Sequence, residues 1–239
     1  CKLISPALSG IYASDQYEVD KILLETDASQ DKSCIGANAT LAVSLASARA
    51  AANYYKIPIF RHIGGANANR LPIPMMNILN GGAHASNNVE IQEFMIVPIG
   101  APTFTKAMEM SISVYHALGH ILKESHLGTT VGDEGGFAPY LSSKEEAIEL
   151  ILQAIEKAGY VPGRDITLGL DCASSEFYEG GIYDYTVFEG PGAKQLDREG
   201  QVAYLRDLIS KYPIDSIEDG MAENDWKGWE MLTAEIGDR

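Results

Sequence analysis

The chain has 239 residues, of which 46% are hydrophobic and 21% are charged, a balance typical of a globular protein with a sizeable core. Its net charge of -15 argues against nucleic acid and anionic membranes as partners. The three cysteines form no CxxC pair, which argues against a disulfide scaffold, and no apolar run approaches the roughly 18 residues that span a bilayer. Since no signal peptide is visible either, we expect a cytoplasmic protein without a membrane span.

Residues 1–66 predict a small helical unit. Its clearest helix covers residues 35–56, where Asn38 is the expected N-cap and Leu41, Leu45 and Ala48 or Ala52 share one face. Glycine and asparagine dominate residues 61–69, so we expect a linker there and place the domain boundary between residues 66 and 67.

Two apolar strands are predicted next, at residues 71–79 and 89–97. The connection between them, residues 80–88, is too short for a helical crossover, so the strands should pair antiparallel. Two helices follow, one over residues 106–124 and one that begins at a capping box of Ser142 and Glu145 and ends at Gly159. Their expected core faces are Met108, Ile112, Tyr115, Leu118 and Leu122 on the first helix, and Ile148, Ile151 and Ile155 on the second.

A strand, a helix and a second strand are predicted in the last part of the chain. Residues 168–175 and 214–220 are apolar runs that end in carboxylates, and the segment between them has apolar residues at helical spacing. In such a unit the two strands run parallel and adjacent. With a last helix after Asp225, the order from residue 71 is β-β-α-α-β-α-β-α, which predicts an α/β fold.

Asp171 and Glu218 are the candidate metal ligands, because they should lie side by side at the carboxyl ends of these parallel strands. Neither stretch contains a lysine or arginine that could neutralise them. A divalent cation would, and oxygen ligands favour Mg²⁺. The spacing alone leaves a second interpretation open, in which both are helix-capping or loop carboxylates.

Other polar residues occur in settings that favour chemistry. Glu134 lies between glycines in VGDEGG, and a dry pocket near other carboxylates would raise its pKa and make it a general acid, although an ordinary acidic turn is the alternative. Gln92 and Glu93 interrupt an apolar strand, where a buried glutamate is costly unless it is paired or functional. His84 lies in a glycine-rich, accessible loop.

Five further residues have structural interpretations. His116 and His120 have the spacing of a metal pair, but their apolar neighbours predict an ordinary packed helix. Trp226 and Trp229 are expected in the core. Cys172 follows Asp171 within a strand, so we expect an inert buried thiol that faces away from the site.

Four long motifs then carry a resemblance to a known family. They are PMMNILNGGAHASNNVEIQEFM, VGDEGGFAP, LGLDCASSEFY and YPIDSIEDGMAENDW, and GANATLAVSLASARAAA adds a helix that precedes them. Together they resemble enolases of the bacterial type. The resemblance implies an incomplete enolase-type TIM barrel, its first half, at residues 67–239, preceded at residues 1–66 by the helical end of an α+β capping domain.

The resemblance also implies a reaction and a set of site residues. Enolases convert 2-phospho-D-glycerate to phosphoenolpyruvate in glycolysis and use two Mg²⁺ ions, and the complete enzyme is usually a homodimer. Asp171 and Glu218 match ligands of the tighter-bound metal, and Glu134 matches the acid that helps the 3-hydroxyl leave. Glu93 matches the partner of that acid, and His84 and Gln92 match positions that contact the substrate.

Several parts of the family's site have no match in this sequence, among them a third metal carboxylate, the general-base lysine and a second active-site lysine. We therefore expect a partial chain that is inactive by itself and aggregation-prone or marginally stable. Two alternatives to an enolase piece are a related enzyme for another carboxylate substrate and a non-catalytic truncated enolase that acts as a binding surface. The motifs of the enolase loops argue against the first of these.

Overall fold

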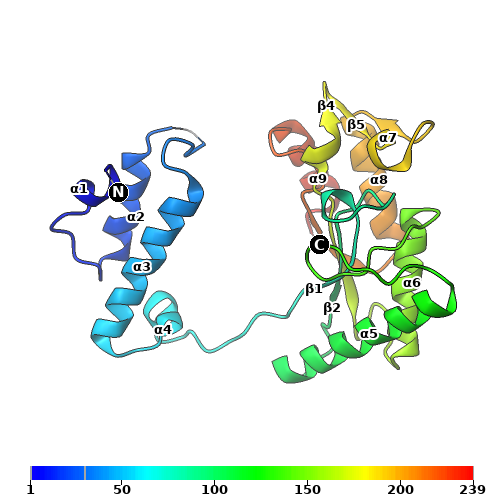
Figure 1. The fold of residues 1–239 in the computed structure, drawn as a ribbon, viewed down its shortest axis with the longest axis horizontal. Helices are drawn as coiled ribbons and strands as arrows, with labels where there is room; N and C mark the ends of the chain where they lie inside the picture. The colour runs from blue at the N-terminus through cyan, green and yellow to red at the C-terminus, as the bar shows by residue number, and fades with distance from the viewer. Residues whose placement is uncertain (1, 30, 239) are drawn as a thin grey trace. The chain divides into compact units, whose positions relative to one another are not determined.

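The computed structural model describes residues 2–29 and 31–238. Cys1, Gln30 and Arg239 lie outside the described residues. The expectation of a partial chain concerns the two ends of the chain, so it also falls outside the described residues. The contacts divide the chain into two compact units, Cys1–Leu71 and Pro72–Arg239, called here the first unit and the second unit (Figure 1). None of the helices in the described residues is long and apolar enough to cross a membrane.

The first unit is helical where it is described. Its helices are α1 (Ile4–Ala7), α2 (Gln16–Thr26), α3 (Ala37–Tyr55) and α4 (Ile59–Gly64). After α4 the described residues form no helix or strand until β1 of the second unit begins, and most side chains in this segment are exposed.

Helix α3 differs from its prediction at its start and on its apolar face. It begins after Gly36 and no side chain caps it, so the predicted Asn38 cap is wrong. Its buried residues are small alanines such as Ala48 and Ala52, whereas the side chains of Leu41 and Leu45 are exposed. The buried hydrophobic cluster of this unit is correspondingly small and is formed by Ile4, Val19 and Leu23.

The second unit is built on a sheet with the strand order β1-β2-β3-β7. The strands are β1 (Met76–Asn80), β2 (Glu93–Val97), β3 (Thr167–Asp171) and β7 (Ile214–Glu218). The pairs β1–β2 and β2–β3 are antiparallel and β3–β7 is parallel, which confirms both predicted pairings. Within the described residues this sheet is open, because β1 and β7 lie at its two edges.

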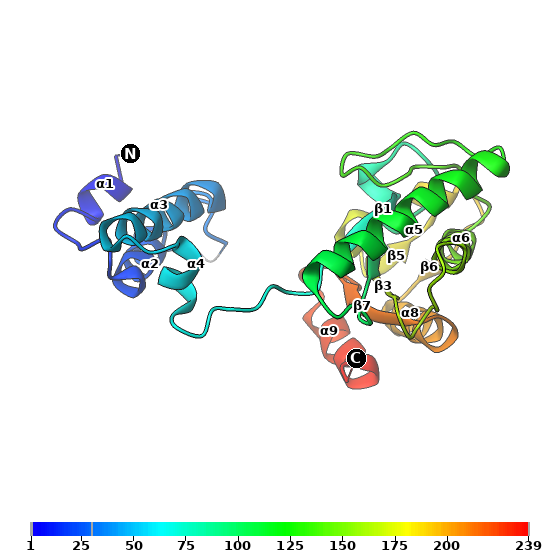
Figure 2. The same cartoon turned by 90° about the horizontal axis from the view of Figure 1, so that it is seen from below.

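Four long helices accompany the described strands of this sheet. They are α5 (Phe104–Glu124), α6 (Lys144–Lys157), α8 (Arg198–Lys211) and α9 (Trp226–Ile236), which confirms the predicted order β-β-α-α-β-α-β-α of an incomplete barrel. In Figure 2, α6 and α8 lie on the same side of β3 and β7. Phe94, Leu168 and Leu170 belong to the core between the sheet and the helices, with Ile148 and Ile151 of α6.

Two details of α5 and α6 correct the prediction. Ile112, assigned to the core face of α5, is exposed, and Val114 is buried instead, so the buried stripe lies on a neighbouring face of the helix. At the start of α6 the capping serine is Ser143, whose hydroxyl accepts from the Glu146 backbone N–H, and not Ser142. The Glu146 carboxylate accepts the Ser142 N–H in return, so the capping box is displaced by one residue.

A second, small sheet was not predicted. It contains β4 (Tyr178–Glu179), β5 (Ile182–Asp184) and β6 (Gln195–Leu196), with the short helix α7 (Thr186–Glu189) between β5 and β6, and we call residues 178–196 the flap. Its strands are two or three residues long, too short for any periodicity to show in the sequence. The flap is held by Tyr183 and Tyr185, which are both buried.

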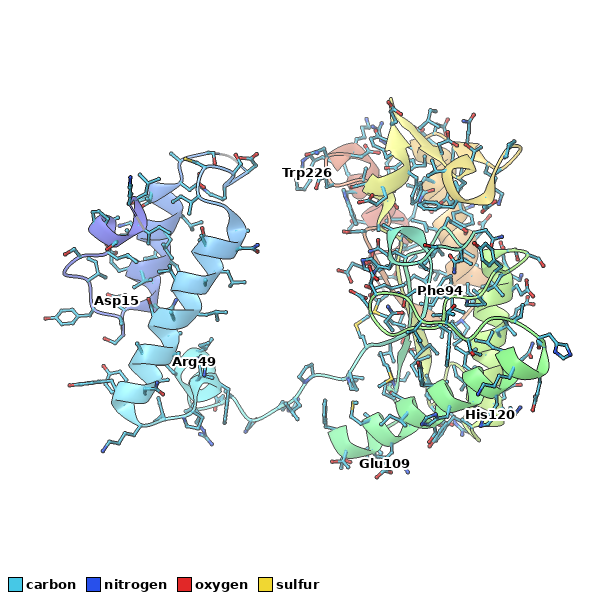
Figure 3. The ribbon with its side chains drawn as sticks, viewed as in Figure 1. Asp15, Arg49, Phe94, Glu109, His120 and Trp226 are labelled. Atoms are coloured by element: carbon cyan, nitrogen blue, oxygen red, sulfur yellow. The ribbon has the colours of Figure 1, made fainter. Side chains whose placement is uncertain are left out.

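The residues given structural interpretations from the sequence differ in their burial. Trp226 is 77% exposed, so its predicted core position is wrong, and Figure 3 shows it and His120 at the surface, with Phe94 inside. His116 and His120 are exposed on α5, whose opposite face packs through Leu118 and Leu122, as expected of an ordinary packed helix. Trp229 is half-buried and donates to the Ala222 carbonyl, and Cys172 is buried as predicted.

Candidate active site

The carboxylates of β3 and β7 are direct neighbours. Asp171 and Glu218 are paired residues in the parallel register, as expected from the sequence. The ladder continues past both strand ends, because the Cys172 N–H donates to the Glu218 carbonyl at 3.0 Å and the Ser174 N–H to the Asp219 carbonyl at 3.1 Å. Backbone pairing on both sides of the carboxylates therefore fixes their relative position.

Strand β2 brings a third carboxylate to the same end of the sheet, beside Asp171. Glu93 is the first residue of β2, not a mid-strand residue as predicted, and it is the register partner of Asp171. Gln92, just before the strand, donates its backbone N–H to the Asp171 carbonyl at 3.1 Å and its side-chain amide to Asp171 Oδ2 at 3.4 Å. The other carboxylate oxygen of Asp171 accepts from the Ala173 N–H at 3.0 Å.

Glu134 comes from a glycine loop that lies against β1. The Asn80 N–H donates to the Phe137 carbonyl at 2.8 Å, and the Phe137 N–H donates to the Ile78 carbonyl at 2.9 Å. A Cβ on Gly136 would lie 2.9 Å from the Leu79 backbone nitrogen, so only glycine allows this close approach. The expectation that Glu134 occupies a dry pocket is wrong, because its side chain is 45% exposed.

His84 lies between the two glutamates. Its Nδ1 is 3.8 Å from Glu93 Oε1 and 3.7 Å from Glu134 Oε2, and these three side chains form a group whose potential ligand atoms lie within 4.8 Å of one another. Asn77 was not identified from the sequence, although it is one of the two polar residues in β1. Its side-chain amide donates to Glu134 Oε2 at 3.1 Å.

Glu93 and Glu134 share a proton, and it resides on Glu93. Burial, a hydrogen bond to Glu134 and the charges of Glu134, Asp171 and Glu218 raise the pKa of Glu93 to about 8. The pKa of Glu134 is lowered, mainly by its hydrogen bond with Glu93. Burial opposes this shift, and smaller effects of the Asn77 amide and of His84 add to it. The expectation of a raised pKa at Glu134 is therefore wrong, because the more buried partner keeps the proton.

The donor set at the strand ends fits a hard divalent cation. Burial and the charge of Asp219 raise the pKa of Asp171, and burial followed by the charges of Asp171 and Asp219 raises the pKa of Glu218. No lysine or arginine is among the described groups that shift these two carboxylates. Neighbouring oxygen ligands with uncompensated charge favour Mg²⁺ over a softer metal. The group of His84, Glu93 and Glu134 fits Mg²⁺ less well, since it includes an imidazole and a protonated carboxyl.

The backbone is strained directly after each carboxylate-bearing strand. Ala173 has a φ of 44° and Asp219 a φ of 47°, both in the left-handed region that costs free energy for residues with a side chain. Such conformations persist only where surrounding contacts enforce them, and they concentrate at functional sites. The sequence carries no signal for them, because alanine and aspartate do not mark the left-handed region as glycine does.

The chain matches two sequence models of one family. Residues 68–239 match "Enolase, C-terminal TIM barrel domain", and residues 1–63 match "Enolase, N-terminal domain". The first match covers more than half of the chain and includes each carboxylate described above.

Proposed function

Because this chain belongs to the enolase family, we propose that its second unit supplies part of an active site for the Mg²⁺-dependent dehydration of 2-phospho-D-glycerate to phosphoenolpyruvate. The observation that carries this proposal is the proton-sharing pair Glu93–Glu134 beside the paired carboxylates Asp171 and Glu218. One pair can hold a proton at neutral pH, and the other can hold a cation. The proposed Mg²⁺-dependent dehydration needs both functions.

Asp171 and Glu218 would hold one of the two Mg²⁺ ions that the reaction uses. Their adjacent positions and raised pKa values support this assignment, since a cation would relieve the repulsion between them. When bound, Mg²⁺ supplies Lewis-acid stabilisation of the negative charge that develops on the substrate carboxylate. Gln92, which donates to Asp171, would orient that ligand and also contact the substrate.

Glu134 is the proposed general acid and Glu93 its proton reservoir. The 3-hydroxyl of the substrate leaves as water if a proton reaches its oxygen as the carbon–oxygen bond breaks. Glu134 is the more exposed member of the pair, so it faces an incoming substrate, while the hydrogen bond from Glu93 resupplies the proton. His84, within 4 Å of both glutamates, is the proposed substrate contact beside them.

We further propose that the 239 residues do not turn over 2-phosphoglycerate by themselves. Proton abstraction needs a base, which the enolase resemblance assigns to a lysine, and no lysine is among the described groups that act on Glu93, Glu134, Asp171 or Glu218. A soluble preparation of this chain that forms phosphoenolpyruvate at a substantial rate would contradict this. A non-catalytic binding surface is the second candidate function, favoured by the open edge of β7 in the described sheet.

Other parts of the proposal rest on family membership. They are a place in glycolysis, a cytoplasmic location, a small phosphorylated substrate as the main partner, and a homodimer. The division into a capping domain at residues 1–66 and a barrel domain from residue 67 is proposed on the same basis, with each unit matching its own family model.

The direct test is Mg²⁺ binding by the 239-residue chain, measured by titration calorimetry. Asp171→Asn should weaken Mg²⁺ binding by about tenfold or more, because it removes the charge from a ligand but keeps its shape. Asp207→Asn is the matched control, since its carboxylate is exposed on α8, and it should leave the affinity unchanged. Equal affinities for wild type and Asp171→Asn, or no binding by wild type, would overturn the proposed metal site.

A further inference from the structure

Gln201 is a fully buried polar side chain in the first turns of α8. Its exposed fraction is 0%, and its neighbours Val202 and Leu205 belong to the hydrophobic core. An amide in such a place costs free energy unless both of its ends are hydrogen-bonded, so an apolar residue would suit the helix better. We therefore expect both the NH₂ group and the carbonyl oxygen of Gln201 to have hydrogen-bond partners.

Both ends of the Gln201 amide are used. Nε2 donates to the Gly220 carbonyl at 3.1 Å, and Oε1 accepts from the Tyr185 hydroxyl at 2.7 Å. The orientation of the amide is determined by chemistry, because a carbonyl can only accept and must face the NH₂ end. Gln201 thus connects the flap, through Tyr185, to the turn that follows β7.

That turn carries Glu218. Three successive carbonyls are held there: those of Glu218 and Asp219 by the backbone N–H groups of Cys172 and Ser174, and that of Gly220 by Gln201. The first two bonds come from backbone N–H groups just after β3, so they do not depend on the identity of any side chain. The third is the one made by a side chain, and it closes the turn in which Asp219 has its strained φ of 47°.

The packing around Gly220 leaves the turn little freedom. A Cβ at this position would lie 2.9 Å from side-chain atoms of both Ile217 and Leu205 and 3.1 Å from Leu232. The bond from Gln201 is therefore made within a close-packed site, and its loss cannot be repaired by water without moving the helix. A shift of the turn would move Glu218, two residues earlier, away from its register partner Asp171.

We infer that Gln201 is a positioning residue for Glu218, which holds that carboxylate where it and Asp171 can share a divalent cation. The inference rests on the proposed function, because it needs Asp171 and Glu218 to be metal ligands. It adds a residue that touches neither metal nor substrate and that connects the site to the flap. Outer partners that orient a ligand typically change metal affinity by about 10–100-fold when they are lost.

The experiment measures Mn²⁺ affinity from the electron paramagnetic resonance of free Mn²⁺, together with the thermal midpoint of each protein. It compares four versions of the 239-residue chain: wild type, Gln201→Met, Tyr185→Phe and Ile148→Val. Gln201→Met removes both hydrogen bonds at nearly equal side-chain length. Ile148→Val is the matched control, because it trims a buried side chain of the same core on α6 and removes no hydrogen bond.

Gln201→Met should bind Mn²⁺ about tenfold more weakly than wild type, at temperatures well below its thermal midpoint, while Ile148→Val keeps wild-type affinity. Tyr185→Phe, which leaves the bond to Gly220 in place, should lie between them. If Gln201→Met lowers only the thermal midpoint, Gln201 serves the fold alone and the inference is wrong, although the proposed metal site stands.

Absence of Mn²⁺ binding by wild type would instead overturn the proposed function and this inference together. Should Gln201→Met fail to fold, Tyr185→Phe decides by itself. An unchanged Mn²⁺ affinity in that variant would then contradict the inference, because Tyr185→Phe removes the hydrogen-bond partner that holds the other end of the Gln201 amide while it donates to the Gly220 carbonyl.

Discussion

At the scale of single residues, the shared proton on Glu93 gives the site a pH dependence with a definite sign. The pKa of Glu93 is raised from 4.5 to about 8 in the folded chain. Below pH 4.5 both the folded and the unfolded chain hold this proton, so Glu93 contributes its full stability there. As the pH rises toward 8, the unfolded chain releases the proton and the folded chain keeps it, so this contribution is lost.

Glu93→Gln should therefore stabilise the metal-free protein at high pH. The glutamine is neutral at every pH, so we expect a free energy of unfolding about 4 kcal/mol above wild type at pH 8 and within about 1 kcal/mol of it at pH 5. Urea titrations in the presence of a chelator measure this difference. Tryptophan fluorescence reports on the second unit alone, because both tryptophans, Trp226 and Trp229, lie in it.

Glu176→Gln is the control, since Glu176 is an exposed acid of the same unit. Its unfolding free energy should differ from that of wild type by less than about 0.5 kcal/mol at both pH values. A Glu93→Gln protein that is no more stable than wild type at pH 8 would show that the folded chain does not protect this proton.

At the scale of elements, the loop that carries Glu134 depends on two glycines for different reasons. Gly136 has no room for a side chain, because a Cβ would lie 2.9 Å from the Leu79 backbone nitrogen. Gly135 has open space around it but a φ of 86°. The loop is further held by Tyr115, which stacks on Phe137 at 4.6 Å and donates to the Gly135 carbonyl.

The two glycine-to-alanine variants should separate close packing from backbone conformation. We expect Gly136→Ala to cost about 3 kcal/mol of unfolding free energy, because the loop must move away from β1. Gly135→Ala should cost only about 1 kcal/mol, the strain of a left-handed alanine. Urea unfolding followed by tryptophan fluorescence measures both. Equal costs would mean that the loop does not lie against β1.

At the scale of the whole molecule, the two units differ in the cores that hold them. The buried cluster of the first unit consists of Ile4, Val19 and Leu23, whereas that of the second extends over the sheet and its helices. Burial of apolar surface is the main stabilising term in folding, so the second unit should carry most of the stability of the chain.

Limited trypsin digestion should cut first after Arg70. This residue is exposed and lies in the stretch without helix or strand between α4 and β1, where backbone can enter a protease. We expect two fragments, residues 1–70 and 71–239, by mass spectrometry, and the larger one should keep a cooperative unfolding transition. Arg70→Gln should delay this cut. A first cut within the second unit would contradict the conclusion that this unit carries most of the stability of the chain.

The sequence by itself predicted the main architecture and named the candidate residues of the site. Apolar runs that end in carboxylates predicted the parallel pair β3–β7 and the neighbouring positions of Asp171 and Glu218. Two strands joined by a helical crossover run parallel, so their carboxyl ends lie side by side. The short connection between the first two strands predicted their antiparallel pairing. Both pairings depend on the length and type of the segment that connects the two strands, and this can be read from the sequence alone.

The tertiary structure alone decided what depends on several segments at once. It put the shared proton on Glu93 rather than Glu134, because relative burial is set by strands and loops distant in sequence. It left Trp226 exposed, and it brought Asn77 to Glu134 and Gln201 to Gly220. Each of these outcomes rests on the distance between residues far apart in the chain, and such distances are fixed only when the core packs.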